Sequence, residues 1–91
     1  MTPEFLPKIL VVDDDKLTCW ALEKEFAGLG HATKVAGNGE EALAELRRRP
    51  YDIVFLDIHL PDANGIDLLR EIDTVSRDAK IIIMSCDASE T

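Results

Sequence analysis

The sequence predicts an α/β domain with an open parallel sheet, in which strands and helices alternate in the order β-α-β-α-β-α-β. Three short apolar runs, rich in β-branched residues and without polar alternation, support this fold class: Ile9 to Val12, Ile53 to Leu56 and Ile81 to Met84. Such runs are typical of parallel strands that are buried on both faces. Helical segments lie between them, and this alternation predicts right-handed crossover connections.

The first helix is expected over residues 16 to 28. Asp15 is a good N-cap, and Gly30 is typical of the position just past the end of a helix. A weaker apolar run, His31 to Ala36, then suits an edge strand. The side chains that share the apolar face of this helix are Cys19, Leu22, Phe26 and Leu29.

The second helix is expected over residues 39 to 48, after Asn38 as N-cap and before Pro50. Its first turn carries glutamates and its last turn arginines, and both placements favour the helix dipole. The third helix is expected over residues 65 to 75. Its inward-facing side chains are Leu68, Leu69, Ile72 and Val75.

The charge balance restricts the partners of the chain. Its 91 residues make one small domain with a net charge of -8, from 18 acidic and 10 basic residues. Direct nucleic-acid binding is disfavoured, because no basic stripe is present to neutralise phosphates. We interpret the only basic run, Arg47 to Arg49, as a helix end. The acidity is compatible with a divalent cation or a basic protein surface.

The sequence carries no pattern typical of secretion or of a membrane span. The first residues lack a basic stretch followed by an apolar one, and the longest apolar runs are far shorter than a spanning helix. The two cysteines, Cys19 and Cys86, are far apart and form no metal-binding spacing. We therefore expect a cytoplasmic protein, with Cys19 as a core residue of the first helix.

Acidic and hydroxyl side chains follow the predicted strands. Asp13 and Asp14 end the first strand, Asp57 ends the third, and Ser85 ends the fourth. Ligands bind beyond the carboxyl ends of such sheets, where the winding reverses, so these residues are expected in one crevice. Clustered carboxylates repel one another and raise each other's pKa. A hard cation such as Mg2+ balances this negative charge. An aspartate beside it can take up a phosphoryl group.

Simpler interpretations exist for each residue. Asp13 and Asp14 could only help to cap the first helix, although Asp15 suffices for that. Asp57 alone could be an ordinary loop residue. Its interpretation as a site residue depends on the turn over residues 60 to 65 that starts a new helix. Ser85 could be a turn residue. A small magnesium-dependent phosphohydrolase is a further alternative, but its second catalytic acid would be expected at position 59, which is His59.

At these motifs the sequence resembles bacterial response-regulator receiver domains. Lys8 to Asp15 resembles their opening strand and acidic pair, and Tyr51 to Pro61 resembles their phosphoacceptor strand and following loop. Asn64 to Leu69 resembles the start of their third helix, and Ile81 to Ser85 their fourth strand. The resemblance is nearest to the receivers of nitrogen-regulation-type transcriptional activators. It implies a flavodoxin-like receiver fold over residues 8 to 91, with residues 1 to 7 as an N-terminal extension.

The resemblance also implies roles for single residues. Asp57 would accept the phosphoryl group, and Ser85 would be the switch hydroxyl that closes on it. Asp14 and Asp57 would bind Mg2+ through their carboxylates, Asp13 would bind it through water, and His59 would contribute its backbone carbonyl. The donor would be a sensor histidine kinase, and an output domain or partner protein would respond. We expect no enzymatic activity beyond self-phosphorylation and autodephosphorylation.

Two departures from the family pattern affect these expectations. Cys86 stands where the family usually has alanine. The family also has a fourth helix, a fifth strand and a fifth helix after Ser85, and the fifth strand ends in a lysine that binds the phosphoryl group. We therefore expect a receiver that is incomplete at its C-terminus. Its alternative function is that of a pseudo-receiver, which binds other proteins without being phosphorylated.

The same comparison predicts self-association. With the family strand order 2-1-3-4-5, a chain that ends after the fourth strand leaves Ile81 to Met84 at an edge of the sheet. An apolar edge strand can pair with another chain. The exposed apolar residues Leu17, Trp20 and Ala21 of the first helix are expected to form a second patch. We therefore expect a homodimer or a higher oligomer.

Overall fold

The computed structural model describes residues 6–84 and contains a four-stranded parallel sheet with the order β2-β1-β3-β6. Its strands are β1 (Ile9–Val12), β2 (Thr33–Ala36), β3 (Ile53–Asp57) and β6 (Lys80–Met84). The three helices are α1 (Lys16–Gly28), α2 (Gly39–Arg48) and α3 (Gly65–Val75). A short antiparallel pair, β4 (His59–Leu60) and β5 (Ala63–Asn64), joins β3 to α3.

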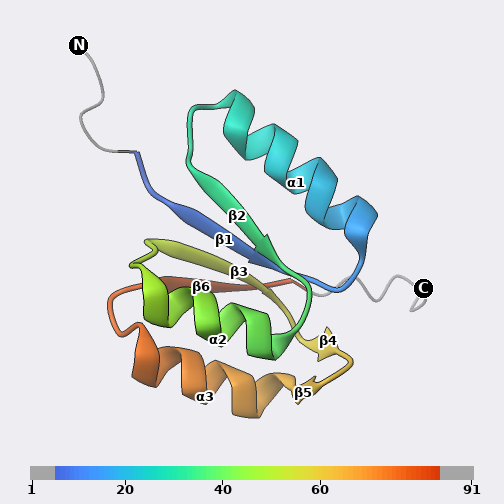
Figure 1. Cartoon of the computed structure of the whole chain (residues 1–91), viewed down its shortest axis with the longest axis vertical. Helices are drawn as coiled ribbons and strands as arrows, with labels where there is room; N and C mark the ends of the chain where they lie inside the picture. The colour runs from blue at the N-terminus through green and yellow to red at the C-terminus, as the bar shows by residue number, and fades with distance from the viewer. Residues whose placement is uncertain (1–5, 85–91) are drawn as a thin grey trace.

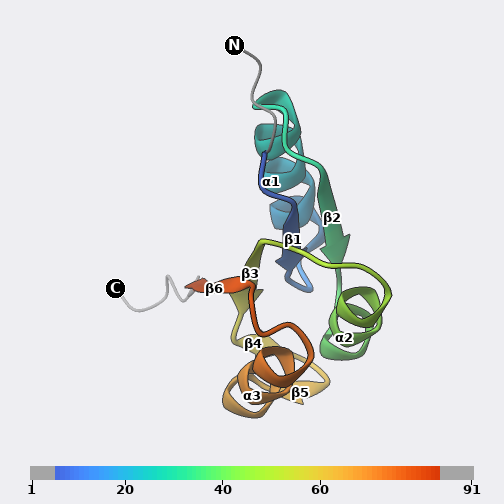
Figure 2. The same ribbon diagram turned by 90° about the vertical axis from the view of Figure 1, so that its left-hand side faces the viewer.

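The sheet separates two layers of helices (Figures 1 and 2). α1 covers one face, where Cys19 packs with Ile9 and Val11 of the central strand. α2 and α3 lie side by side on the other face and bury Leu46, Leu68 and Ile72 against the sheet. The larger core is therefore on the α2 and α3 side. This arrangement confirms the predicted flavodoxin-like α/β fold.

Asp15 and Asn38 cap α1 and α2 as expected from the sequence, and the structure adds a third cap at α3. The Asp15 side chain accepts a hydrogen bond from the Leu17 N–H at 3.1 Å, and the Asn38 side chain accepts one from Glu41 at 2.8 Å. α3 begins after Asn64, whose side chain accepts from the N–H of Ile66 at 2.8 Å. Gly30, just past α1, has a positive φ of 96°, which glycine adopts without strain. Local sequence signals thus define all three helix starts.

Three expectations about the strands and α1 were wrong in detail. β6 is not buried on both faces, since Ile82 and Ile83 are 38% and 46% exposed. Its position at the edge of the sheet, where it pairs only with β3 among the described residues, confirms the other expectation for this run. Leu29 does not belong to the buried face of α1, since it lies past the helix end and is exposed. The second strand begins at Thr33 rather than His31. Among the described residues, no helix is long and apolar enough to cross a membrane.

Candidate functional site

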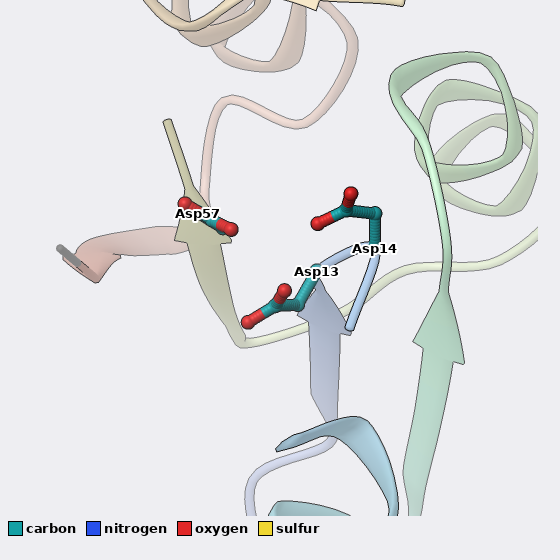
Figure 3. Close-up of side chains that lie close together, drawn as sticks. All are labelled: Asp13, Asp14 and Asp57. Atoms are coloured by element: carbon teal, nitrogen blue, oxygen red, sulfur yellow. The ribbon is translucent and has the colours of Figure 1, made fainter. Parts of the chain in front are cut away.

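Three carboxylates converge at the carboxyl ends of the central strands. β1 and β3 are paired with Val12 opposite Leu56, so that Asp13 emerges beside Asp57. One oxygen atom from each of Asp13, Asp14 and Asp57 can be chosen so that all three lie within 4.8 Å of one another. Figure 3 shows the three side chains around one small space. The structure thus brings together three of the four side chains that the sequence predicted for one crevice, and the fourth, Ser85, lies outside the described residues.

Backbone hydrogen bonds fix two of these carboxylates. The His59 N–H donates to Asp57 Oδ1 at 2.9 Å, and the Asp15 N–H donates to Asp13 Oδ1 at 3.0 Å. Asp13 and Asp57 are buried, whereas Asp14 is exposed. The site therefore has two oriented acids at its floor and one acid that faces solvent.

The cluster is electrostatically strained without a cation. Burial raises the pKa of Asp13, and the negative charges of Asp57 and Asp14 raise it further, against the opposing effect of the Asp15 N–H. Three carboxylate groups at this spacing are a set of hard oxygen donors, the kind that binds Mg2+. The residues present thus fit a hard divalent cation, which would offset the repulsion among them.

The carboxylates line a small open pocket of about 200 Å3. Its other lining residues are Asp15, Thr18 and His59. No sequence signal pointed to Thr18. Its hydroxyl donates to Asp15 Oδ2 at 2.8 Å, so it belongs to the helix cap as well as to the pocket wall. His59 lies at the rim with an exposed side chain. Its predicted role as a carbonyl ligand stays a prediction.

A hairpin that the sequence did not predict holds the backbone that follows Asp57. The loop after Asp57 folds into β4 and β5, and Asp62 between them accepts hydrogen bonds from the N–H groups of Gly39 and Glu40, at 2.8 and 3.2 Å. Close packing completes the contact, since a Cβ on Gly65 would lie 2.7 Å from Cβ of Ile58. The backbone after Asp57 is therefore held by α2 and by the start of α3.

Cys19 lies behind the cluster and behaves as a core residue. Its Sγ atom donates to the backbone carbonyl of Asp13 at 3.1 Å, and the side chain is buried under α1. Burial raises the pKa of its thiol, and the charge of Asp13 adds to this effect. The thiolate is therefore disfavoured, which agrees with the expected structural role.

A family comparison decides the class of this domain. The family "Response regulator receiver domain" matches residues 9–91. The chain belongs to the response regulator receiver domain family. Among curated proteins, this receiver domain is 37% identical over 81 residues to the transcriptional regulatory protein ZraR of Klebsiella oxytoca, covering 89% of this chain and 18% of ZraR. It is 35% identical to the DNA-binding transcriptional regulator NtrC of Azospirillum brasilense, covering 85% of this chain and 16% of NtrC.

These relatives confirm the predicted resemblance to nitrogen-regulation-type activators, and the receiver domain spans less than a fifth of their length. Solved structures agree with the fold. The response regulator TrrA of Thermotoga maritima, in complex with Mg(2+)-BeF, matches with a TM-score of 0.82 and 37% identity over 92% of this chain and 73% of TrrA. A response regulator of Burkholderia pseudomallei, with a phosphorylated aspartic acid and a calcium ion, matches with a TM-score of 0.83 and 25% identity over 88% of this chain and 47% of its own.

Proposed function

We propose that this receiver domain accepts a phosphoryl group from a sensor histidine kinase onto Asp57, in a reaction that depends on Mg2+, and so switches a downstream output. The observation that carries the proposal is the position of Asp57. It ends a central strand, and its carboxylate lies within 4.8 Å of those of Asp13 and Asp14. A buried, oriented carboxylate inside a cluster of acids is a suitable phosphoryl acceptor once a cation balances the charge.

The family resemblance assigns the residues that would hold Mg2+, and three of them, Asp13, Asp14 and Asp57, are those that the structure brings together. Asp14 and Asp57 would bind it directly, Asp13 through a water molecule, and His59 through its backbone carbonyl. When bound, the ion would neutralise charge on the transferring phosphoryl oxygens. One relative was solved in complex with Mg(2+)-BeF and another with a phosphorylated aspartic acid and a calcium ion, and both support a divalent cation at this site.

The chemistry requires one free oxygen on Asp57. Oδ1 accepts the His59 N–H, so we assign the attack on phosphorus to Oδ2. A new bond forms between Oδ2 and phosphorus, and the bond from phosphorus to the donor's imidazole nitrogen breaks. The imidazole leaves with that electron pair, and Asp57 becomes an acyl phosphate. The hydrogen bond from His59 keeps the carboxylate oriented for this step, and the chain itself is the substrate, so we propose no enzymatic turnover of other molecules.

A small phosphodonor tests this proposal without the kinase. The chain is incubated with acetyl phosphate and Mg2+, and intact mass spectrometry measures the addition of one phosphoryl group, with acetate as the leaving group. We expect the addition in Mg2+ and its absence in excess EDTA. Equal phosphorylation with and without the chelator would contradict the assigned metal dependence.

The pseudo-receiver remains the second candidate, because the pocket around Asp57 is lined by acids, Thr18 and His59, with no lysine from residues 6–84. In that case the same fold would bind a partner protein and carry no phosphoryl group. The acetyl phosphate experiment separates the two functions. A chain that binds Mg2+ but never gains a phosphoryl group would favour the second.

A further inference from the structure

All five arginines of the sequence lie at one end of the molecule. Arg48, Arg49 and Arg77 line one pocket, Arg70 lines a second, and Arg47 lines both. The pockets have volumes of about 330 and 300 Å3 and adjoin along the C-terminal halves of α2 and α3. These helix ends lie side by side, opposite the end of the sheet that carries β4 and β5 (Figure 1). We call these five residues the arginine surface.

Helix stability explains only part of the arginine surface. Arg47 and Arg48 lie in the last turn of α2, where positive charge favours the helix dipole. The last turn of α3 contains no basic residue, because Arg70 lies in its middle and Arg77 follows its C-cap, Ser76. The helix dipole therefore explains the positions of two of the five arginines. It does not explain why Arg49, Arg70 and Arg77 lie on the same surface.

The arginine surface also carries more positive charge than the acidic residues around it can balance. Arg48 and Arg49 contact Glu45, at 3.9 and 3.4 Å. Within residues 6–84, Arg47, Arg70 and Arg77 form no ion pair. The acidic residues that line the two pockets are Asp78 and Glu71. Five positive charges thus meet two negative charges there and a third on Glu45, in a chain whose net charge is -8.

We propose that the arginine surface binds an acidic segment of a partner protein. A guanidinium group presents a planar fork of donors that matches a carboxylate in a bidentate contact. The two pockets share Arg47 and Val75, so they form a continuous seam that suits an extended chain with several carboxylates. A long polyanion such as nucleic acid would extend beyond this surface and meet the negative charge of the rest of the domain. This proposal is independent of phosphorylation at Asp57.

A peptide of six glutamates is the probe that tests the proposal. NMR titration of the full chain follows the backbone amides and the arginine side-chain N–H groups. We expect saturable shifts at Arg47, Arg70 and Arg77, small changes at Asp13 and Asp57, and binding that weakens as salt is raised. The Arg47→Gln/Arg77→Gln double variant should bind about tenfold more weakly, because it removes two of the free bidentate donors.

The matched control is Lys16→Gln/Lys24→Gln, which removes the same charge from exposed positions on α1. It should bind the peptide nearly as well as the unaltered chain. An equal loss in both double variants would show a general effect of net charge and would overturn the site. Tighter binding of inorganic phosphate or of a single-stranded oligonucleotide at the same residues would overturn the class of partner, and so would the absence of any saturable shift.

Discussion

Asp62 joins the hairpin after the candidate phosphoacceptor to the start of α2, because its Oδ1 atom accepts a hydrogen bond from the N–H of Gly39 at 2.8 Å. Its Oδ2 atom accepts a second one from Glu40 at 3.2 Å. Both N–H groups belong to the first turn of α2, where no helical carbonyl can accept them. One side chain from a distant loop therefore caps a helix and holds the backbone that follows Asp57.

Replacing Asp62 should destabilise the domain. We expect Asp62→Ala to lower the free energy of unfolding by about 1–2 kcal/mol, since two N–H groups lose a charged acceptor. Urea unfolding followed by circular dichroism measures the change. The control is Asp73→Ala, an exposed residue of α3 whose loss should change stability by less than about 0.5 kcal/mol. Equal stabilities for the two variants would refute the role of Asp62.

Mg2+ should stabilise the chain before any phosphoryl transfer, because it relieves the repulsion among the clustered acids. At a concentration one hundred times the dissociation constant the gain would be about 2.7 kcal/mol. Trp20 lines a pocket together with Asp13 and Asp14, so its fluorescence should report the titration. We expect Asp14→Ala to weaken binding strongly. A titration curve unchanged by this variant would remove Asp14 from the site.

The contact between Tyr51 and Glu45 should give a measurable pH dependence. The Tyr51 hydroxyl donates to Glu45 at 2.7 Å, and this hydrogen bond is the main cause of the lowered pKa of Glu45. Because the folded-state pKa lies below the unfolded one, the stabilisation is present above the ordinary carboxyl range and is lost as the pH falls through the folded value. We expect Tyr51→Phe to cost about 1 kcal/mol at pH 7.

The loss of stability caused by Tyr51→Phe should become smaller in strongly acidic solution, where Glu45 is protonated. Unfolding of Tyr51→Phe, Glu45→Gln and the double variant at several pH values measures the coupling between the two side chains. A cost for Tyr51→Phe that stays constant from neutral to strongly acidic pH would show that the hydrogen bond to the carboxylate does not matter.

The 91-residue chain should self-associate through β6. Ile82 and Ile83 are exposed on this strand, which pairs only with β3 among the described residues, and its one charged residue is Lys80 at its start. Burial of apolar surface at about 25 cal/mol per Å2 then favours pairing of two such edges. We expect sedimentation velocity at tens of micromolar to show a dimer or a larger species.

A charge on the edge should prevent this association. Ile82→Lys should weaken it by about tenfold or more, because a lysine opposes strand pairing at an edge. Leu29→Lys, at a position just past α1 that is 66% exposed, is the control and should leave it unchanged. A well-folded chain that stays monomeric would refute the prediction, as would an equal effect of both variants.

Much of the fold could be predicted because local signals and buried runs agree. Asp15 and Asn38 cap helices at the expected places, and the four main strands fall on the apolar runs. The apolar run of β6 was expected both as a buried strand and as an edge strand, and among the described residues it is the edge. The hairpin of β4 and β5 was missed because each of its strands has two residues, too few for an alternating pattern.

The candidate site was predictable to the extent that it depends on strand ends. Parallel strands bring their carboxyl ends to one edge, so the convergence of Asp13, Asp14 and Asp57 followed from the strand order. Asp62 was not found because it contacts Gly39 across a long sequence separation. Thr18 was not found because its position in the pocket wall depends on how α1 packs beside the strand ends. The arginine surface was reduced to a helix end for the same reason: Arg70 and Arg77 join it only in the folded chain.

The location of the phosphoryl group after reaction with acetyl phosphate and Mg2+ decides whether Asp57 is the acceptor. Borohydride reduction followed by peptide mass spectrometry identifies the modified residue. We expect modification at Asp57 alone, its loss in Asp57→Asn, and its retention in the control Asp52→Asn, which lies at the other end of β3. Phosphorylation of Asp57→Asn at the rate of the unaltered chain would show that Asp57 is not the acceptor. Modification of the same other residue in the unaltered chain and in Asp57→Asn would show this too.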